Sequence, residues 1–462
     1  MPGTNHLMPD LRPLPLLAVA TSLFSATAAV AAPTVFDHAR VIDGTGQAAR
    51  PDVSVVVDDG RIVSIGGQAP ANAQHIDLTG KTLLPALISD HSHVGLVSGT
   101  GAASTNYTRE NILAALKQYT QYGVLTVTAL GLNKSPLFDQ LRHEQHAGAN
   151  PGADLFGVDQ GISAPNGIPP ASMVHGLGPD QIYRPTTPLE ARKDVDRMID
   201  EGTDLVKIWV DDFRNDVPNG KVYPKLKPII YRAAIDEAHK RHVRVAVHIH
   251  DLDVAKAVVD AGADIVAHGV RDKPVDQALI MAMKQRGTWY IATLDLDEAN
   301  YLFAEHPEWL NNPFLAAGLN PALRAQFASS DWRIKTLAKP ITPASRHALS
   351  INQHNLLILH KAGIHIGFGT DSGAAPTRIP GFAEHRELAL TVAAGLTPMQ
   401  AITLATGNAA ALLQLSDRGL IAPGKRADLL IVRGAPDQDI TAINHIDQVW
   451  QRGMKVSGAL GE

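Results

Sequence analysis

The centre of the chain alternates short apolar runs with stretches of helical periodicity. Eight of these runs have the length and the β-branched content of buried strands, and they cover residues 83–93, 124–131, 154–161, 204–211, 243–250, 264–269, 288–293 and 365–371. In the clearest unit an apolar run precedes a predicted helix over 252–261, which Gly262 ends, and another apolar run follows. Strands that alternate with helices form parallel sheets, so eight such units predict an α/β fold of the TIM-like (β/α)8 barrel type.

Both ends of the chain have a different rhythm, with short β-branched runs separated by turns. Asp59-Gly60 between two such runs predicts a tight hairpin, and residues 427–432 and 448–456 repeat this character near the C-terminus. Neither end has enough strands to bury a sheet face alone. We therefore expect residues 32–82 and 420–462 to form one small composite β-sandwich beside a barrel that covers residues 83–419.

A long segment, residues 294–364, separates the last two apolar runs and is rich in Pro, Trp, Asn and Ala. Connections of that length inside a domain usually have a structure or a function of their own. The segment predicts a helical insertion, a lid or a subdomain, over the barrel mouth.

The N-terminus has the pattern of an export signal. Residues 14–31 are apolar and end in the small residues Ala29-Val30-Ala31, an Ala-x-Ala cleavage site. The alternative is an ordinary apolar helix of the fold. We expect residues 1–31 to be a signal peptide and the mature protein to be exported, either periplasmic or secreted. No later run is long and apolar enough to predict a membrane span.

Composition narrows the chemistry. The chain has no cysteine, which excludes disulfides, thiolate catalysis and Cys-ligated metals, whereas its 20 histidines allow a metal held by imidazole. Lys and Arg number 41 against 46 Asp and Glu, so the net charge of −5 gives no basic surplus for nucleic acid. The composition therefore leaves a small-molecule partner and homo-oligomer formation open.

Polar residues stand at the ends of five of the predicted strands. Alternate residues of a strand point to the same side, so the two histidines of His91-Ser92-His93 share a face. Catalytic groups of barrels gather at these strand ends, and imidazoles with a carboxylate form a divalent-metal set. A lone histidine or aspartate would more often be structural. The converging residues are His91, His93, Lys207, His248, His268 and Asp371.

Lys207 is the unusual member, since an ammonium group has no lone pair for a cation. Carboxylation by carbon dioxide would turn it into a carbamate with two oxygens that can bridge two metals. The alternative is a buried lysine paired with Asp371 or another carboxylate.

At these positions the chain resembles the amidohydrolase superfamily, close to its imidazolonepropionase-like and prolidase-like branch with two metals. The resemblance covers nearly all of the mature chain. The family usually has glycine and aspartate where this chain has Ala86 and Ser89, which leaves either weaker support of the imidazoles or support from Asp90. The motifs that carry the resemblance lie at residues 84–94, 123–128, 204–208, 245–248, 265–269, 369–371 and 423–429.

The resemblance implies a binuclear site, for which zinc is the expected metal, in a (β/α)8 barrel with a composite β-sandwich. It implies that His91 and His93 bind the more buried cation and that His248 and His268 bind the other. A carboxylated Lys207 would bridge the two cations, and Asp371 would complete the site.

The expected activity is metal-dependent hydrolysis of a C–N bond in an amide or dipeptide. Two cations about 3.5–4 Å apart would share a water and acidify it to a bridging hydroxide. Asp371 would accept the proton and deliver it to the leaving nitrogen as base and then acid. His250 would bind the substrate or the oxyanion, or be structural. The candidate partners of a substrate carboxylate are Arg214, Tyr223 and Arg378.

Two other functions compete with this one. A deaminase or a cyclic-amide hydrolase usually works with one metal and without a bridging lysine, so metal content would separate it from a binuclear enzyme. A metal-binding or carbohydrate-binding barrel without turnover would have no need of a proton shuttle such as Asp371. The complete ligand set favours the binuclear hydrolase.

Overall fold

Eight parallel strands position the candidate site. The computed structural model describes Gly3 and residues 32–215 and 220–460, so apart from Gly3 the predicted signal peptide lies outside the described residues. Each of the eight strands falls within one of the predicted runs. One parallel sheet contains β6 (Leu87–Ser92), β9 (Val124–Leu130) and β10 (Asp154–Val158), and the other contains β11 (Val206–Trp209), β12 (Val245–His248), β13 (Ile265–Ala267), β14 (Trp289–Ile291) and β15 (His365–Ile366).

Two parallel bridges connect these sheets at both of their edges. Ile162, just after β10, pairs with Ile208 of β11, and Ser92 of β6 pairs with Ser372, which follows β15. The eight strands thus follow one another in the order of a TIM-barrel-type fold, in which the carboxyl ends of all strands meet at one face.

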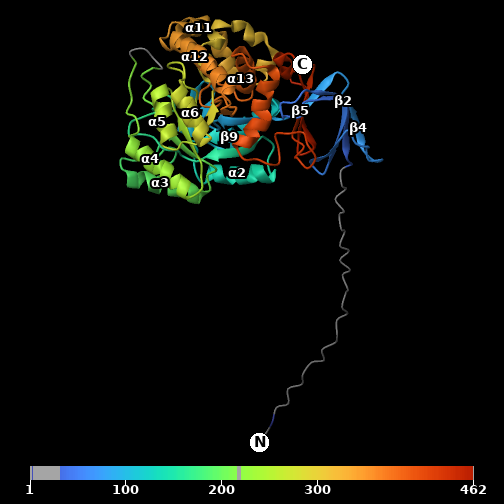
Figure 1. Ribbon diagram of the computed structural model, residues 1–462, viewed down its shortest axis with the longest axis horizontal. Coiled ribbons are helices and arrows are strands. Elements are labelled where there is room, and N and C mark those ends of the chain that lie inside the picture. The colour runs from blue at the N-terminus through green and yellow to red at the C-terminus, as the bar shows by residue number, and fades with distance from the viewer. Residues whose placement is uncertain (1–2, 4–31, 216–219, 461–462) are drawn as a thin grey trace. The chain divides into compact units, whose positions relative to one another are not determined.

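Helices connect the strands, and Figure 1 shows several of them around the strands. Thr187 begins α3 with a capping box, in which it pairs with Glu190, and Gly202 ends this helix in the left-handed conformation. The predicted helix over 252–261 is present as α5. The helices outside residues 294–340 are α1 (Arg109–Gln121), α2 (Leu137–Ala147), α3 (Pro188–Glu201), α4 (Pro228–Lys240), α5 (Leu252–Asp260), α6 (Gln277–Arg286), α12 (Ile341–Lys361), α13 (Phe382–Ala393), α14 (Pro398–Thr403) and α15 (Ala409–Leu412).

Both chain ends contribute to a single eight-stranded sheet, which lies beside the helix-covered strands in Figure 1. Asp59 and Gly60 form the predicted tight turn, with φ of 45° and 71°. Phe36 and Trp450, from opposite ends of the chain, pack edge to face with ring centroids 5.0 Å apart. The strands are β1 (Thr34–Val41), β2 (Arg50–Asp58), β3 (Arg61–Ile65), β4 (Gln74–Asp77), β5 (Lys81–Pro85), β16 (Leu429–Arg433), β17 (Ile446–Gln451) and β18 (Met454–Ser457).

The first predicted barrel strand is wrong as a single element. Residues 83–93 contain the end of β5, in the composite sheet, and all of β6, in the barrel. The chain changes sheets at Ala86, whose N–H donates to the carbonyl of Asp428, whereas the next N–H, of Leu87, donates to Gly123. The composite sheet therefore extends to Pro85 rather than ending at residue 82.

The segment between β14 and β15 is helical, as predicted. Its last helix, α12, is bonded to the barrel, because Asn352 donates to the carbonyl of Ala292 at 2.9 Å. No helix in the described ranges is long and apolar enough to cross a membrane. The helices that precede α12 are α7 (Asp295–Glu298), α8 (Leu302–Glu305), α9 (Pro313–Ala316), α10 (Pro321–Ala328) and α11 (Ser330–Leu337).

Candidate functional site

The structure brings four histidines and an aspartate together at the carboxyl ends of the barrel strands. All five are at least nine-tenths buried and line one cavity of about 410 Å³. The ring centroid of His268 lies 4.5 Å from that of His91 and 4.5 Å from that of His248. The five residues are His91, His93, His248, His268 and Asp371.

Asp371 connects the two histidines of β6. Its Oδ1 lies 3.3 Å from Nε2 of His91 and 3.1 Å from Nε2 of His93. Burial alone would raise the pKa of Asp371, but the Arg378 guanidinium and the imidazoles hold it well below its usual range. Asp371 is therefore a carboxylate at neutral pH, and with the two histidines it forms a group that can hold a metal ion.

Hydrogen bonds fix which imidazole nitrogen keeps a free lone pair. Nε2 of His248 donates to Oδ2 of Asp211 at 3.1 Å, and its buried Nδ1 has no hydrogen-bond partner among the described residues. Nδ1 of His93 donates to the carbonyl of Gly131 at 3.2 Å, which leaves Nε2 as the acceptor. Such partners orient metal-ligating histidines.

His268 is oriented in the same way. The hydroxyl of Thr293 donates to the carbonyl of Ala292 at 2.7 Å, so its oxygen accepts from Nδ1 of His268 at 2.9 Å. The backbone of His268 has a φ of 99°, a strained conformation that is common at functional sites. Burial, with the charge of Lys207, lowers the pKa of His91 to about 3. Burial also lowers the pKa of His248 and His268, so these three imidazoles are neutral at pH 7, the form that binds metals.

Lys207 of β11 is buried near the imidazole of His91, and it forms no ion pair with any of the described residues. It is 1% exposed, and within the described part of the chain its Nζ has no hydrogen-bond partner, while the ring centroid of Trp209 is 5.6 Å away. Burial lowers the pKa of Lys207 to about 7. Lys207 therefore forms no hydrogen-bonded pair with Asp371 or another carboxylate of the described residues, although the charge of Asp371 opposes the lowering of its pKa.

A model of the Amidohydrolase family matches residues 82–456. The chain belongs to this family. Ochratoxinase from Aspergillus niger is 23% identical over 460 residues, which cover 92% of this chain and 87% of that protein. An imidazolonepropionase from Deinococcus deserti is 39% identical over 99 residues, 21% of this chain and 24% of that protein.

A solved structure supports the same fold. The crystal structure of a Xaa-Pro dipeptidase with bound methionine matches this amidohydrolase with a TM-score of 0.71 at 23% identity, over 92% of this chain and 99% of that chain. This likeness supports the fold, and the family match identifies the protein as a hydrolase that acts on carbon–nitrogen bonds.

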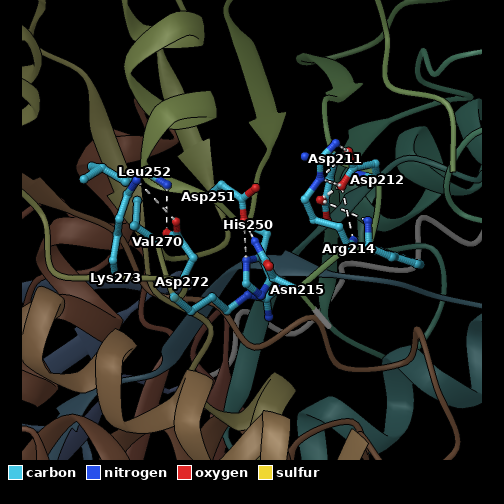
Figure 2. A network of polar contacts seen from close by, with 12 residues as sticks. Asp211, Asp212, Arg214, Asn215, His250, Asp251, Leu252, Val270, Asp272 and Lys273 are labelled. Carbon is cyan, nitrogen blue, oxygen red and sulfur yellow. Dashed lines mark hydrogen bonds and ion pairs between the residues drawn. The ribbon is translucent and has the colours of Figure 1, made fainter. Parts of the chain in front are cut away.

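The residues predicted to bind the substrate have different positions in this amidohydrolase. Tyr223 and Arg378 line the cavity, and Arg378 is bonded to Asp371. Arg214 is not among the lining residues, and Asp212 accepts hydrogen bonds from its guanidinium, as Figure 2 shows.

His250, like Arg214, is not among the residues that line the cavity. Its Nδ1 bonds Oδ1 of Asp251 at 2.9 Å, and the same Oδ1 accepts from Asn215 at 2.7 Å (Figure 2). The carbonyl of His250 accepts from the N–H of Arg271, which does line the cavity. Direct contact of His250 with a substrate stays a prediction.

Sequence reasoning missed three charged residues of the site. Asp211 ends the predicted strand over 204–211, so its place there was a usable signal. Arg271 follows His268 by three residues and is 2% exposed. Asp297 comes from the helical segment, where nothing in the sequence indicates which residues reach the cavity.

Ser89 and Asp90, which precede His91, are hydrogen-bonded to groups other than its imidazole. The hydroxyl of Ser89 donates to Oε1 of Glu384 at 3.0 Å, and Oδ2 of Asp90 accepts from the N–H of Phe368 at 3.0 Å. Neither is hydrogen-bonded to the imidazole of His91 in the described structure. Support of the imidazoles comes instead from Asp211, Thr293 and Gly131.

Proposed function

We propose that this amidohydrolase hydrolyses an amide or dipeptide bond of a small molecule with two divalent cations, zinc being the expected metal. The observation that carries the proposal is the convergence of four buried imidazoles and the carboxylate of Asp371 in one cavity. Nitrogen and oxygen donors of this kind suit zinc. We expect His91 and His93 to hold one cation and His248 and His268 the other.

The side chains fit such ions. Nδ1 of His91, Nδ1 of His248 and Nζ of Lys207 are buried without a hydrogen-bond partner among the described residues. Unsatisfied buried polar atoms are costly, so a cluster of them indicates a missing group. A carboxylated Lys207 would supply the negative charge and the two oxygens that the set lacks. The cations, when bound, supply Lewis acidity and an acidified water.

The chain's own residues account for the movement of protons. Asp371 is charged and has an oxygen between two imidazoles, so it can accept a proton from the attacking water and return it to the leaving nitrogen. Arg378 keeps Asp371 in its charged form. We propose that Arg378 and Tyr223 also bind a substrate carboxylate, since both line the cavity.

The apolar part of the wall favours a substrate with a bulky apolar group. Aliphatic and aromatic side chains surround the histidine cluster, and their removal from water contributes about 25 cal/mol per Å² of buried apolar surface. These lining residues include Leu132, Ile168, Met173, Val174, Phe213 and Ile341.

Metal analysis of the purified protein tests the proposal most directly. Two divalent ions per chain and turnover of N-acyl amino acids or dipeptides are expected. His91→Ala and His268→Ala should each lower metal content and activity together, whereas the exposed His306→Ala should change neither. Full activity with one ion or with none would contradict the binuclear site and favour the deaminase-like alternative.

Export is a separate proposal that rests on the sequence alone. The apolar run before Ala31 predicts removal of residues 1–31. N-terminal sequencing of the protein from its native host should find a start after Ala31, and an intact Met1 or Pro2 would contradict export by this signal.

A further inference from the structure

One wall of the cavity is built by the helical segment between β14 and β15. Asp297 of α7, Asn300 just after it and Ser345 of α12 all line the cavity that contains the histidine cluster. We call these three residues the insertion wall. They have no part in the proposed metal site, so their polar groups are available for another ligand.

Asp297 is the charged member of the insertion wall and is poorly satisfied. It is 4% exposed, and its Oδ1 has a long contact of 3.4 Å with Nη1 of Arg271. Its Oδ2 is buried and accepts no hydrogen bond from any residue in the described ranges. Burial raises the pKa of Asp297, which reflects this lack of compensation. A donor on the ligand would remove the cost of the unsatisfied oxygen.

Asn300 also presents an acceptor to the cavity. The amide nitrogen of Asn300 donates to the hydroxyl of Ser345 at 2.9 Å and to the carbonyl of Leu296 at 3.4 Å. Both N–H groups of Asn300 are thereby used, and no donor among the described residues bonds its Oδ1. A ligand that carries hydrogen-bond donors therefore matches Asp297 and Asn300, whereas Ser345 keeps its O–H as a donor.

The negative charge of Asp297 favours a cationic ligand over an anionic one. A carboxylate that approached Arg271 would come close to Asp297, and two like charges in a buried site repel strongly. The proposed partner of a substrate carboxylate, Arg378, is bonded to Asp371 instead of Asp297. A cation beside Oδ2 would face the carboxylate of Asp297, whose one ion pair among the described residues is the 3.4 Å contact with Arg271.

We propose that Asp297 binds an ammonium group of the substrate and that the enzyme prefers compounds with a free amine over their N-acylated or deaminated analogues. This proposal extends the proposed function. It rests on that function in one respect, the position of the bond that is hydrolysed. Recognition of the ammonium group by Asp297 does not require turnover.

Equilibrium binding can test this without hydrolysis. L-phenylalaninol and 3-phenyl-1-propanol differ by one ammonium group and contain no amide, so isothermal titration of the metal-loaded protein compares them directly. We expect the amine to bind at least about 10-fold more tightly, and Asp297→Asn to reduce this preference to about 3-fold or less. The exposed Asp331→Asn, also an acid of the helical segment, should leave the preference unchanged.

Two results would overturn the assignment. One is equal affinity of the wild-type protein for the two alcohols, and the other is an undiminished preference in folded Asp297→Asn, which would locate ammonium recognition elsewhere, for instance at the metals. If Asp297→Asn unfolds because Arg271 loses the charge of this carboxylate, the double variant Arg271→Gln with Asp297→Asn replaces the ion pair by a neutral pair, and its preference between the two alcohols is measured instead.

The same measurements separate this assignment from the proposed hydrolysis. A wild-type protein that turns over no amide but discriminates the two alcohols through Asp297 would contradict the proposed function alone. A protein that hydrolyses amides without regard to a free amine, and binds the two alcohols equally, would contradict the assignment alone.

Discussion

Asp211 accepts a hydrogen bond from Nε2 of His248 at 3.1 Å, and both side chains are more than nine-tenths buried. The proton on Nε2 leaves the Nδ1 lone pair of His248 free. Burial works to raise the pKa of Asp211, but His248 and the nearby His250 and Arg271 hold it below its usual range. A charged carboxylate therefore fixes the tautomer of an imidazole and increases its basicity as a ligand.

We expect Asp211→Asn to weaken metal binding about 10- to 100-fold, because the imidazole loses its charged partner while the first ligands stay in place. Competition with a chromogenic chelator measures this affinity. Asp212→Asn removes the adjacent acid, which binds Arg214 rather than an imidazole, and should leave the affinity unchanged. Equal affinities in wild type and Asp211→Asn would show that the bond has no role in metal binding.

The barrel strands and their histidines could be predicted because parallel strands buried on both faces give continuous apolar runs. The end of each run then locates its polar residue, as for His248 after residues 245–247 and for Asp371. The switch of sheets at Ala86 could not be predicted, because β5 and β6 share one apolar run and only the missing N–H of Pro85 distinguishes them.

The partners that complete the site depend on contacts between distant parts of the chain. Thr293 orients His268, and Asp297 reaches the cavity from a segment whose path over the barrel is set by tertiary packing. Neither residue belongs to a periodic pattern or a motif. The ligand set could therefore be predicted from the sequence, but the groups that orient the ligands could not. Arg214 was also predicted to bind the substrate, whereas its guanidinium is bonded to Asp212 and it does not line the cavity.

Gly369 provides a test of the packing between β6 and the segment after β15. A Cβ at this position would lie 2.6 Å from the backbone nitrogen of His91, and the N–H of Thr370 already bonds the carbonyl of His91. We expect Gly369→Ala to lose about 1–3 kcal/mol of unfolding free energy and to lower metal content, since overpacking moves the ligand strand. Thermal denaturation and metal analysis measure the two effects.

The matched control is Gly101→Ala, where a Cβ would meet nothing within 4 Å. This variant should resemble wild type in both measurements. An equally stable and fully metal-loaded Gly369→Ala would mean that β6 can move without disturbing its histidines.

A buried ionic cluster joins the barrel to the C-terminal segment and predicts acid sensitivity. Asp154 accepts hydrogen bonds from Arg418 at 2.6 Å and from Arg426 at 3.0 Å. Burial opposes its charge, but His146 and the two guanidiniums hold its pKa below the usual range. The stability from a depressed carboxyl pKa is present above the unfolded value of about 3.9 and is lost as the pH falls below it.

Asp154→Asn should therefore lose about 1.5–3 kcal/mol at pH 7, because the guanidiniums of Arg418 and Arg426 each lose one carboxylate partner and keep another, Asp417 and Asp428. Its unfolding free energy should also fall less steeply than that of wild type as the pH drops below about 4. Urea denaturation at a series of pH values measures both. The exposed Asp236→Asn should change stability by no more than about 0.5 kcal/mol. If the unfolding free energy of Asp154→Asn falls as steeply below about pH 4 as that of wild type, Asp154 is not the source of the acid sensitivity.

The pKa of Lys207, lowered by burial to about 7, gives the amine the form that reacts with carbon dioxide. A neutral amine adds to carbon dioxide to give a carbamate and a proton, so the lowered pKa moves this reaction into the neutral range. In ¹³C-bicarbonate the protein should show one carbamate NMR signal that grows as the pH rises through about 7, whereas exposed lysines titrate near pH 10.4. Lys207→Ala should lack the signal.

Lys207 also has a chemical rescue that separates a bridging carbamate from a structural lysine. Lys207→Ala should lose turnover and bind fewer than two metals, and formate or acetate should partly restore both, because a free carboxylate can occupy the emptied space and bridge the same ions. Lys207→Arg should not be rescued, since its guanidinium keeps a positive charge among the ligands at any working pH. Lys335 is exposed and lies outside the site, so added formate should change neither the turnover nor the metal content of Lys335→Ala. If Lys207→Ala retains two metals and near wild-type turnover without an added carboxylate, the carbamate has no part in the site.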